Sequence, residues 1–378
     1  MQFIKANRDA VLKPLQVVAG IVERRHTLPI LANILITKNG ENVSFLATDV
    51  EIQIQTTASL STSAEQGATT VQAKKLIDIL KALPDGVEVS VAVNNKKAAI
   101  TAGKSRFALQ TLGAEEFPTM TIADSFNASF SLPQKKLKHL FHMVHFAMAQ
   151  QDIRYYLNGL LLVTDGHSVK VVATDGHRLA YCEAQLEGDD LPPMARHDVI
   201  IPRKTVLELQ RLLADSDEAV QIDVASNQVR LRFGEVEMVS KLVEGKFPDY
   251  QRVIPSGYQR YVRVSREVLA ASLNRASILT TDKFKGVRLT LSPATLKVQT
   301  NNAEQEEAVD ELEVDYHDDD DGGGKTLEIG FNVSYLLDVL ANLKSDEVQI
   351  DLGDANTSAL LTVPGDDSFR YVVMPMRI

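Results

Sequence analysis

The chain of 378 residues contains no tryptophan, only 6% aromatic residues and a single cysteine, Cys182. One cysteine excludes a framework of disulfides within the chain and is typical of a reducing compartment. Hydrophobic residues make up 44% of the sequence, which is enough for a substantial core. The length predicts two or three domains.

Long apolar runs are also absent. No run reaches the ~18 residues of a membrane span. The N-terminal MQFIKANRDAVLKPL lacks the basic and apolar regions of a signal peptide. We therefore expect a soluble, cytoplasmic protein without a membrane partner.

The net charge of −10 argues against a nucleic-acid partner, but the charge is unevenly distributed. Six windows with helical spacing of apolar residues sum to +10, which leaves −20 for the rest of the chain. If these helices share one face, that face is basic and can hold a phosphate backbone without reading bases. Ordinary solvated helix surface is the alternative.

Three kinds of landmark repeat along the chain at intervals of 126 to 130 residues. They are a polar residue after an alternating strand, an acidic residue in a helical pattern, and a hydrophobic residue before proline. The members are Asp49, Asp175 and Asn302; Asp78, Glu208 and Asp338; Phe117-Pro118, Phe247-Pro248 and Met374-Pro375. The repetition predicts three copies of one unit, with domains at 1–126, 127–257 and 258–378.

Each copy shows two helical patterns among alternating strands. The helices are expected at 8–22, 133–148 and 265–279, and at 74–83, 204–213 and 333–343. Pro133 suits a first-turn position and Ser265 an N-cap. With about eight strands per copy, the pattern predicts an α+β fold of three similar domains, each with two helices on antiparallel sheets.

Thr-Asp-Gly-His occurs twice, at 164–167 and 174–177. Asp165-Gly166 is a hairpin-turn dipeptide between apolar strands, so the first copy is interpreted as a structural turn. The second is also a strand-end turn, and its apolar neighbours favour a surface pocket. Aspartate and histidine also bind metals, which leaves a metal-dependent hydrolase as the alternative function.

Other candidate sites lack the context that their chemistry needs. Gly103-Lys104-Ser105 and Gly324-Lys325-Thr326 imitate the end of a phosphate loop, but the upstream glycine is missing and strands follow instead of helices. The acidic-glycine segment 318–324 is interpreted as a solvated loop tip of unassigned role. Cys182 is expected to be a buried structural thiol. The sequence contains no convincing catalytic arrangement.

Several longer segments resemble one family, the bacterial sliding clamps, which are beta subunits of DNA polymerase III. The resemblance runs the full length of the chain. Its most specific marks are LKPL (12–15), TLPIL (27–31), QDIRYYLNG (151–159), VATDGHRLA (172–180), SKLVEGKFPDYQRVIP (240–255), NNAEQEEA (301–308), GFNVSYLLDVL (330–340) and YVVMPMRI (371–378).

The resemblance implies a head-to-tail homodimer whose six domains close a ring around duplex DNA. Such a ring binds DNA without sequence specificity and tethers DNA polymerase III and other proteins that carry a clamp-binding motif. A separate clamp loader opens it, and the ring itself performs no chemistry and needs no metal or cofactor. A cytoplasmic, nucleoid-associated location follows from this role.

The resemblance also implies three groups of site residues. The DNA-facing group is Arg25, Lys74, Gln151, Tyr155, Tyr156 and Arg203. The dimer interface pairs Lys104, Arg106 and Phe107 of the first domain with Ile278, Leu279, Glu304, Glu306 and Glu307 of the third. The partner-peptide groove comprises Leu157, Thr174, Gly176, His177, Arg178, Leu179, Pro248, Arg252, Val253, Val373, Met374, Pro375, Met376 and Arg377.

Overall fold

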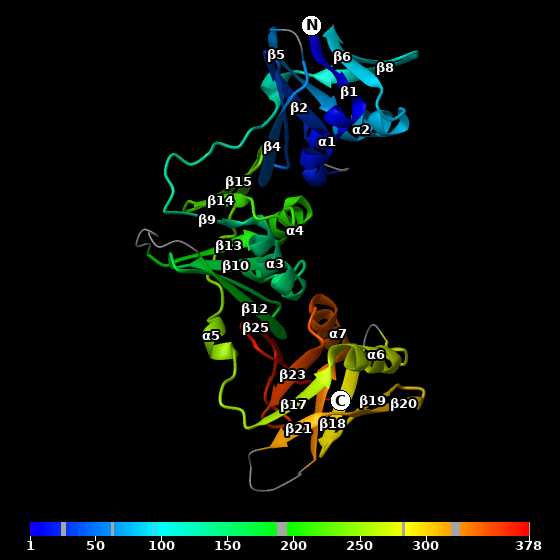
Figure 1. Ribbon diagram of the computed structural model, residues 1–378, viewed down its shortest axis with the longest axis vertical. Helices are drawn as coiled ribbons and strands as arrows, with labels where there is room; N and C mark the ends of the chain where they lie inside the picture. The colour runs from blue at the N-terminus through cyan, green and yellow to red at the C-terminus, as the bar shows by residue number, and fades with distance from the viewer. Residues whose placement is uncertain are drawn as a thin grey trace. The chain divides into compact units, whose positions relative to one another are not determined.

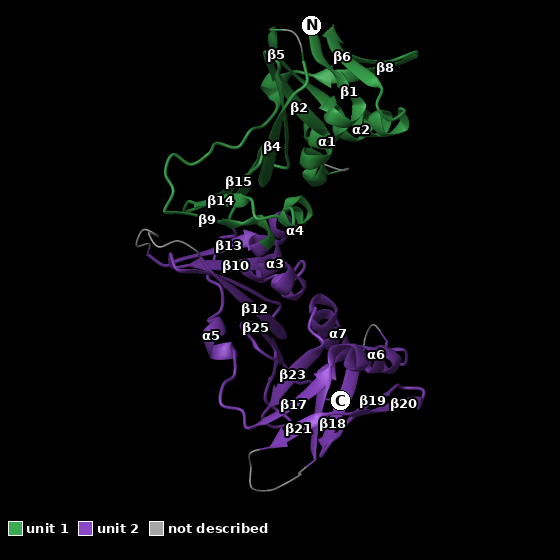
Figure 2. Ribbon diagram, in the orientation of Figure 1, with its two compact units in different colours: residues 1–135, 207–242 green, residues 136–206, 243–378 purple. Residues whose placement is uncertain are grey.

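A computed structural model describes residues 1–23, 28–61, 64–94, 96–186, 195–281, 284–318 and 326–377. The chain divides into two compact units (Figure 2). Unit 1 combines Met1–Lys135 with Leu207–Leu242, and unit 2 combines Lys136–Val206 with Val243–Ile378. The central repeat contributes residues to both units, because its strands pair with strands of the repeats on either side.

Unit 1 is built on a twelve-stranded sheet in the order β1-β6-β7-β8-β5-β2-β3-β4-β16-β15-β14-β9 (Figure 1). Its pairs are all antiparallel, and β16 of the central repeat continues the sheet from β4 of the first. The strands are β1 Gln2–Asn7, β2 Asn33–Asn39, β3 Asn42–Thr48, β4 Ile52–Ser59, β5 Gln66–Gln72, β6 Glu88–Asn94, β7 Lys97–Ala102, β8 Ser105–Leu112, β9 Ala128–Pro133, β14 Ala219–Val224, β15 Gln228–Phe233 and β16 Val236–Lys241.

Unit 2 contains a nine-stranded sheet, β13-β10-β11-β12-β25-β24-β23-β17-β21, and a four-stranded sheet, β20-β19-β18-β22. Strand β12 of the central repeat pairs with β25 at the end of the chain, with Arg178 opposite Val373. The strands are β10 Gly159–Thr164, β11 Ser168–Thr174, β12 Arg178–Gln185, β13 His197–Pro202, β17 Arg260–Ser265, β18 Gly286–Ser292, β19 Thr295–Asn301, β20 Glu307–Glu313, β21 Asp315–Asp318, β22 Leu327–Asn332, β23 Glu347–Leu352, β24 Ala359–Val363 and β25 Asp366–Val373.

The expected long helices are confirmed, and each begins directly after a strand. They are α1 Arg8–Val18, α2 Ala73–Ala82, α3 Gln134–Val144, α4 Arg203–Leu212, α6 Arg266–Ser277 and α7 Val333–Asn342. The predicted first helix of each copy is shorter than expected, because α1 and α3 continue as the 3₁₀ turns Ala19–Ile21 and His145–Ala147. A one-turn helix, α5 Tyr250–Val253, is additional.

The ends of the helices follow from local chemistry. The Ser265 hydroxyl accepts a hydrogen bond from the Val268 amide, so the predicted N-cap of α6 is confirmed. Asn7 and Asn332 cap α1 and α7 in the same way. The position predicted for Pro133 is wrong: it is the last residue of β9, opposite Ala219, and lies just outside the helix.

Apolar faces of the helices cover one side of the sheets. In unit 1, α1 and α2 lie side by side and α1 packs on β3 and β4 (Figure 1). In unit 2, α6 and α7 form a similar pair. The predicted α+β arrangement of helices on antiparallel sheets is confirmed, with eight, eight and nine strands per repeat within the described residues.

The acidic-glycine segment lies outside the described residues from position 319 onward. Asp318 itself is not part of a loop tip, because it is the last residue of β21 and forms an ion pair with Arg260. Among the described residues, no helix is long and apolar enough to cross a membrane.

Cys182 lies on β12 and is buried, as expected for a structural thiol. Burial, with the nearby carboxylate of Asp366, raises the pKa of the Cys182 thiol to about 12. An ordinary thiol has a pKa near 8.5, so the folded protein at pH 8 should react with Ellman's reagent about a thousandfold more slowly than the unfolded chain. Equal rates in buffer and in denaturant would contradict this placement.

Candidate functional site

The first Thr-Asp-Gly-His segment is a structural turn between β10 and β11. Asp165 Oδ1 accepts hydrogen bonds from the amides of His167 at 3.0 Å and Ser168 at 2.9 Å. A carboxylate engaged in this way organises its own turn. The interpretation of this segment as a hairpin turn is confirmed.

The second segment forms the same turn between β11 and β12, and its relatives in the other repeats do so too. Asp175 Oδ1 accepts from the amides of His177 and Arg178 at 2.9 and 3.1 Å. Asp49 and Asn302, at the corresponding positions, accept from amides two to four residues ahead. The repeated residue therefore has a shared role in shaping the turn.

This geometry does not support the hydrolase alternative. Both aspartates direct oxygens at backbone amides, and Asp175 Oδ2 also faces the Arg178 guanidinium at 3.1 Å. Within the described ranges, no group of three His, Cys, Asp or Glu side chains is placed to hold a metal ion.

The second turn borders a cavity of about 110 Å³ in unit 2. Its floor is apolar because Leu157, Leu179 and Val372 belong to one buried cluster. The polar turn forms one wall and the exposed Met374 another. Within the described residues the lining is Arg154, Tyr156, Leu157, Thr174, Gly176, His177, Arg178, Leu179, Pro248, Val253, Val372 and Met374, and we call this cavity the groove.

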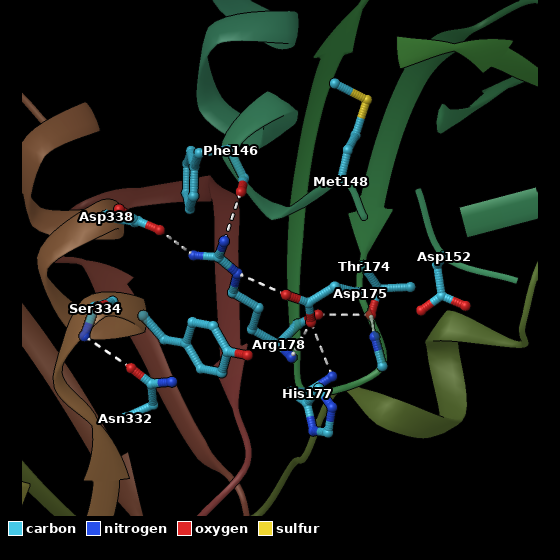
Figure 3. A network of polar contacts seen from close by, with 12 residues as sticks. Phe146, Met148, Asp152, Thr174, Asp175, His177, Arg178, Asn332, Ser334 and Asp338 are labelled. Atoms are coloured by element: carbon cyan, nitrogen blue, oxygen red, sulfur yellow. Dashed lines mark hydrogen bonds and ion pairs between the residues drawn. The ribbon is translucent and has the colours of Figure 1, made fainter. Parts of the chain in front are cut away.

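Arg178 links the wall of the groove to two helical elements (Figure 3). Its guanidinium donates to Asp338 on α7 at 2.5 Å and to the Phe146 carbonyl at 2.8 Å, and it lies 4.5 Å from the centre of the Tyr335 ring. Burial alone would lower the pKa of Arg178, but Tyr371 and the carboxylates of Asp338 and Asp175 raise it. The arginine therefore stays charged and holds the turn against the C-terminal repeat.

A second arginine braces the turn from the opposite side. Arg154 donates to both oxygens of Asp152, at 3.0 and 2.8 Å, and to the Asp175 carbonyl at 3.1 Å. The hydrogen bonds from Arg154 hold the pKa of Asp152 at about 2. Asp152 thus stays ionised at every pH in ordinary use, and the brace persists with it.

Gly176 is required where Arg154 approaches the turn. Its φ is +90°, and a Cβ there would lie 2.8 Å from Arg154 Nη1. Gly176→Ala should lower the free energy of unfolding by about 1–2 kcal/mol, because an L side chain is strained in this region, and should displace Arg154. Urea titration measures the loss in free energy of unfolding. Gly234→Ala is the control, because Gly234 also has a positive φ but a Cβ there would have no atom within 4 Å, so that this variant has backbone strain without a clash. Equal losses in the two variants would contradict the contact with Arg154.

Nine of the residues expected in the partner-peptide groove line this cavity: Leu157, Thr174, Gly176, His177, Arg178, Leu179, Pro248, Val253 and Met374. Val373 is not among the lining residues, and its neighbour on β25, Val372, lines the cavity instead. Strand alternation in YVVM puts the two valines on opposite faces, but only the pairing of β25 with β12 decides which of them faces the cavity. Arg252, with an 87% exposed side chain, pairs with Asp249.

The rest of the tail runs past the groove along the C-terminal repeat. The Met374 amide donates to the His177 carbonyl and the Met376 amide to the Gly330 carbonyl. Pro375, Met376 and Arg377 are absent from the cavity lining. Sequence reasoning missed Arg154, Tyr156 and Val372 in the cavity, and Tyr335, which stacks on the His177 ring with centroids 6.4 Å apart.

The residues expected to face DNA belong to both units. In unit 1, Lys74 lies at the start of α2 and pairs with Asp78 at 2.6 Å, whereas Arg25 lies outside the described residues. In unit 2, Tyr155 is 57% exposed, and Tyr156 packs against the core beneath the groove. Gln151 is exposed at a φ of +56°.

Arg203 begins α4 in the same unit. It donates to the carbonyls of His145 and Met148, at 3.5 and 3.4 Å, near the C-terminal end of the α3 segment. Burial, followed by the positive charge of Arg178, lowers the pKa of Arg203.

The residues expected at the dimer interface lie on or next to the strands β8 and β20 and just after α6. Arg106 and Phe107 are on β8, and Lys104 is in the tight turn between β7 and β8, which excludes the strand-to-helix geometry of a phosphate loop. Glu307 begins β20, and Glu304 and Glu306 lie in the turn before it. Ile278 is 77% exposed after α6, and Leu279 lines a cavity of about 510 Å³ with Phe284 and Arg288.

Comparison with known proteins places the whole chain in one group. Family models match at residues 1–121, 131–249 and 251–377, described as the N-terminal, central and C-terminal domains of the DNA polymerase III beta subunit. The chain is similar to the beta sliding clamps of Pseudomonas aeruginosa (47% identity) and Escherichia coli K12 (43%), covering 98% of both chains in each case. A solved Pseudomonas aeruginosa clamp bound to griselimycin is similar over 100% of both chains, with a TM-score of 0.94 and 47% identity.

Proposed function

The chain belongs to the DNA polymerase III beta subunit family, and from this we propose that it is a DNA sliding clamp. As such it forms a ring that encircles duplex DNA and tethers the replicative polymerase and other DNA-processing proteins for processive synthesis. The observation that carries the proposal is the match to three consecutive clamp domains over the length of the chain.

Two complementary sheet edges support closure of the ring by two copies, head to tail. Strand β8 pairs with β7 along its length but with β5 at only two positions, so Arg106 to Gln110 leave an edge open. Strand β20 is the edge of the four-stranded sheet. The β8 edge is basic, through Lys104 and Arg106, and β20 contains four acidic residues, Glu307, Asp310, Glu311 and Glu313.

Main-chain hydrogen bonds between these edges would continue one sheet from copy to copy. Phe107, Ile278 and Leu279 would supply the apolar centre, with Glu304 and Glu306 beside it. An interface between two different surfaces gives a closed ring only if the rotation from each copy to the next leads back to the first copy. Two copies of three similar domains would satisfy this condition.

Basic residues on the helices support a lining that holds DNA by its backbone. We propose that Arg25, Lys74, Gln151, Tyr155, Tyr156 and Arg203 face the duplex. Contacts of lysine and arginine with phosphates carry no sequence information, which permits sliding. The acidic remainder of the chain would repel DNA from the outer surface.

The groove is the proposed docking site for peptides from DNA polymerase III, the clamp loader and other partners. An apolar floor with few polar groups suits a short segment with apolar side chains. Met374 on the wall of the groove would adapt to different partners. The other expected groove residues of the tail, Pro375, Met376 and Arg377, would contact a bound peptide beyond the cavity lining. We infer that griselimycin binds this groove too. The protein carries out no catalysis, needs no cofactor, and acts in the cytoplasm on the nucleoid.

Retention on DNA tests the proposal. The protein is loaded onto nicked circular DNA by a clamp loader with ATP, isolated by gel filtration, and the DNA is then cut once. A ring held by topology stays on the circle and slides off the linear product. Equal retention on circular and linear DNA would overturn the proposal.

A further inference from the structure

A second cavity, of about 420 Å³, borders the groove in unit 2. Its floor consists of Ile200, Phe247 and Tyr250, which are buried, and its rim includes the charged side chains of Lys246 and Arg196. None of these residues belongs to the groove. We call this cavity the side pocket.

The side pocket and the groove are two openings over one core. Pro248 lines both, and the floors of both belong to the same buried cluster, with Leu179 under the groove and Ile200 under the side pocket. The segment Lys246–Gln251 is exposed except for Phe247 and Tyr250 and separates the two openings, with Pro248 as the lining residue that they share; we call this segment the partition. A chain bound in the groove meets the side pocket as soon as it crosses that proline.

The partition is fixed in place by its own packing. Gly245 has a φ of +126°, and a Cβ there would lie 3.3 Å from Tyr156 Cβ and 3.6 Å from Tyr155 Cε2. Phe247 and Tyr250 anchor the segment in the core on either side of Pro248. The side pocket is therefore preformed, which lowers the entropic cost of binding there.

Charges around the rim define what the side pocket accepts. Arg196 pairs with Asp198 at 2.8 Å, and Asp249 pairs with Arg252 at 3.0 Å. Lys246 forms no ion pair within the described part of the chain and is exposed. The rim thus has one ammonium group available to a carboxylate, beside an apolar floor.

We propose that the side pocket binds the residues that flank the groove-binding segment of a partner, placing an apolar side chain on Phe247 and Ile200 and an Asp or Glu carboxylate on Lys246. The inference rests on the proposed role of the groove as a peptide site. A flank of about four extended residues spans roughly 13 Å, which is enough to cross Pro248 and reach the floor. The side pocket would then separate partners by the residues next to their motifs.

The test compares a short peptide with two extended forms of it on the full-length protein. The short peptide is one that griselimycin displaces, and the extended forms are the same peptide with Asp-Leu-Glu-Ser added at one end or the other. Calorimetry should show about tenfold tighter binding for the extension at the end that leaves the groove at Pro248, and no gain for the other.

Three variants test whether the gain in affinity from the extension arises in the side pocket. Lys246→Glu should reduce affinity for the extended peptide about threefold, as for an exposed ion pair, and Gln251→Trp should remove most of the gain by filling the side pocket. Lys344→Glu, an equal charge change at an exposed residue elsewhere, should have no effect. Affinity for the short peptide should be the same in all variants.

The outcomes separate this inference from the proposal on which it rests. Failure of the short peptide to bind the wild-type protein contradicts the groove itself. Normal binding of the short peptide with no gain from either extension, or with a gain that Gln251→Trp leaves intact, overturns the side pocket alone.

Discussion

Replacing Ile278 and Leu279 together by alanine is expected to convert the dimer into monomers. Ile278 is 77% exposed in the single chain, and Phe107, its proposed neighbour across the interface, is 37% exposed. Burial of an aliphatic side chain contributes about 1.5–3 kcal/mol, so the two truncations would weaken each interface by about 4 kcal/mol. That loss is about a thousandfold in dissociation constant.

Native mass spectrometry or analytical ultracentrifugation at micromolar protein measures the change. Val268→Ala is the matched control, because Val268 is an exposed apolar residue on α6 of the same repeat that has no proposed role in the interface. A double variant that keeps the wild-type mass would remove Ile278 and Leu279 from the interface. Unchanged thermal unfolding of the monomer would show that the fold survives.

Deletion of residues 374–378 is expected to abolish binding of partner peptides and leave the dimer intact. The deletion removes Met374 from the wall of the groove, together with the hydrogen bond that its backbone amide donates to the His177 carbonyl. Loss of a methionine contact that the bound peptide would bury costs about 1.5–3 kcal/mol, and loss of the whole tail should weaken binding by more than about a hundredfold. Strand β25 ends at Val373, so the sheet is untouched.

Fluorescence anisotropy with a labelled peptide that griselimycin displaces provides the measurement. Met374→Ala should give an intermediate affinity, since only the side chain is lost. Peptide affinity that is unchanged in the deletion variant would count against the groove, whereas a change to monomers would show that the tail acts on the interface instead.

The helices could be predicted from sequence because their periodicity is local. The pattern at 74–83 became α2 at Ala73–Ala82, and the pattern at 265–279 became α6 at Arg266–Ser277. The spacing of Asp49, Asp175 and Asn302 also had a local cause, since each side chain closes the same turn through backbone amides.

Contacts distant in the sequence could not be predicted in this way. Nothing in the spacing of residues indicates that β12 pairs with β25, or that Arg178 reaches Asp338 across 160 positions. The residues of β25 alternate between the two faces of the sheet, and the pairing of β25 with β12 decides that Val372 lines the groove instead of Val373. The side pocket likewise depends on how the segment around Pro248 folds over β10 and β13.

Negative-stain electron microscopy of the purified protein tests the central claim most directly. A sliding clamp should appear as closed rings with six lobes and a hole wide enough for duplex DNA, at concentrations where the dimer persists. Compact particles without a hole under those conditions would contradict it.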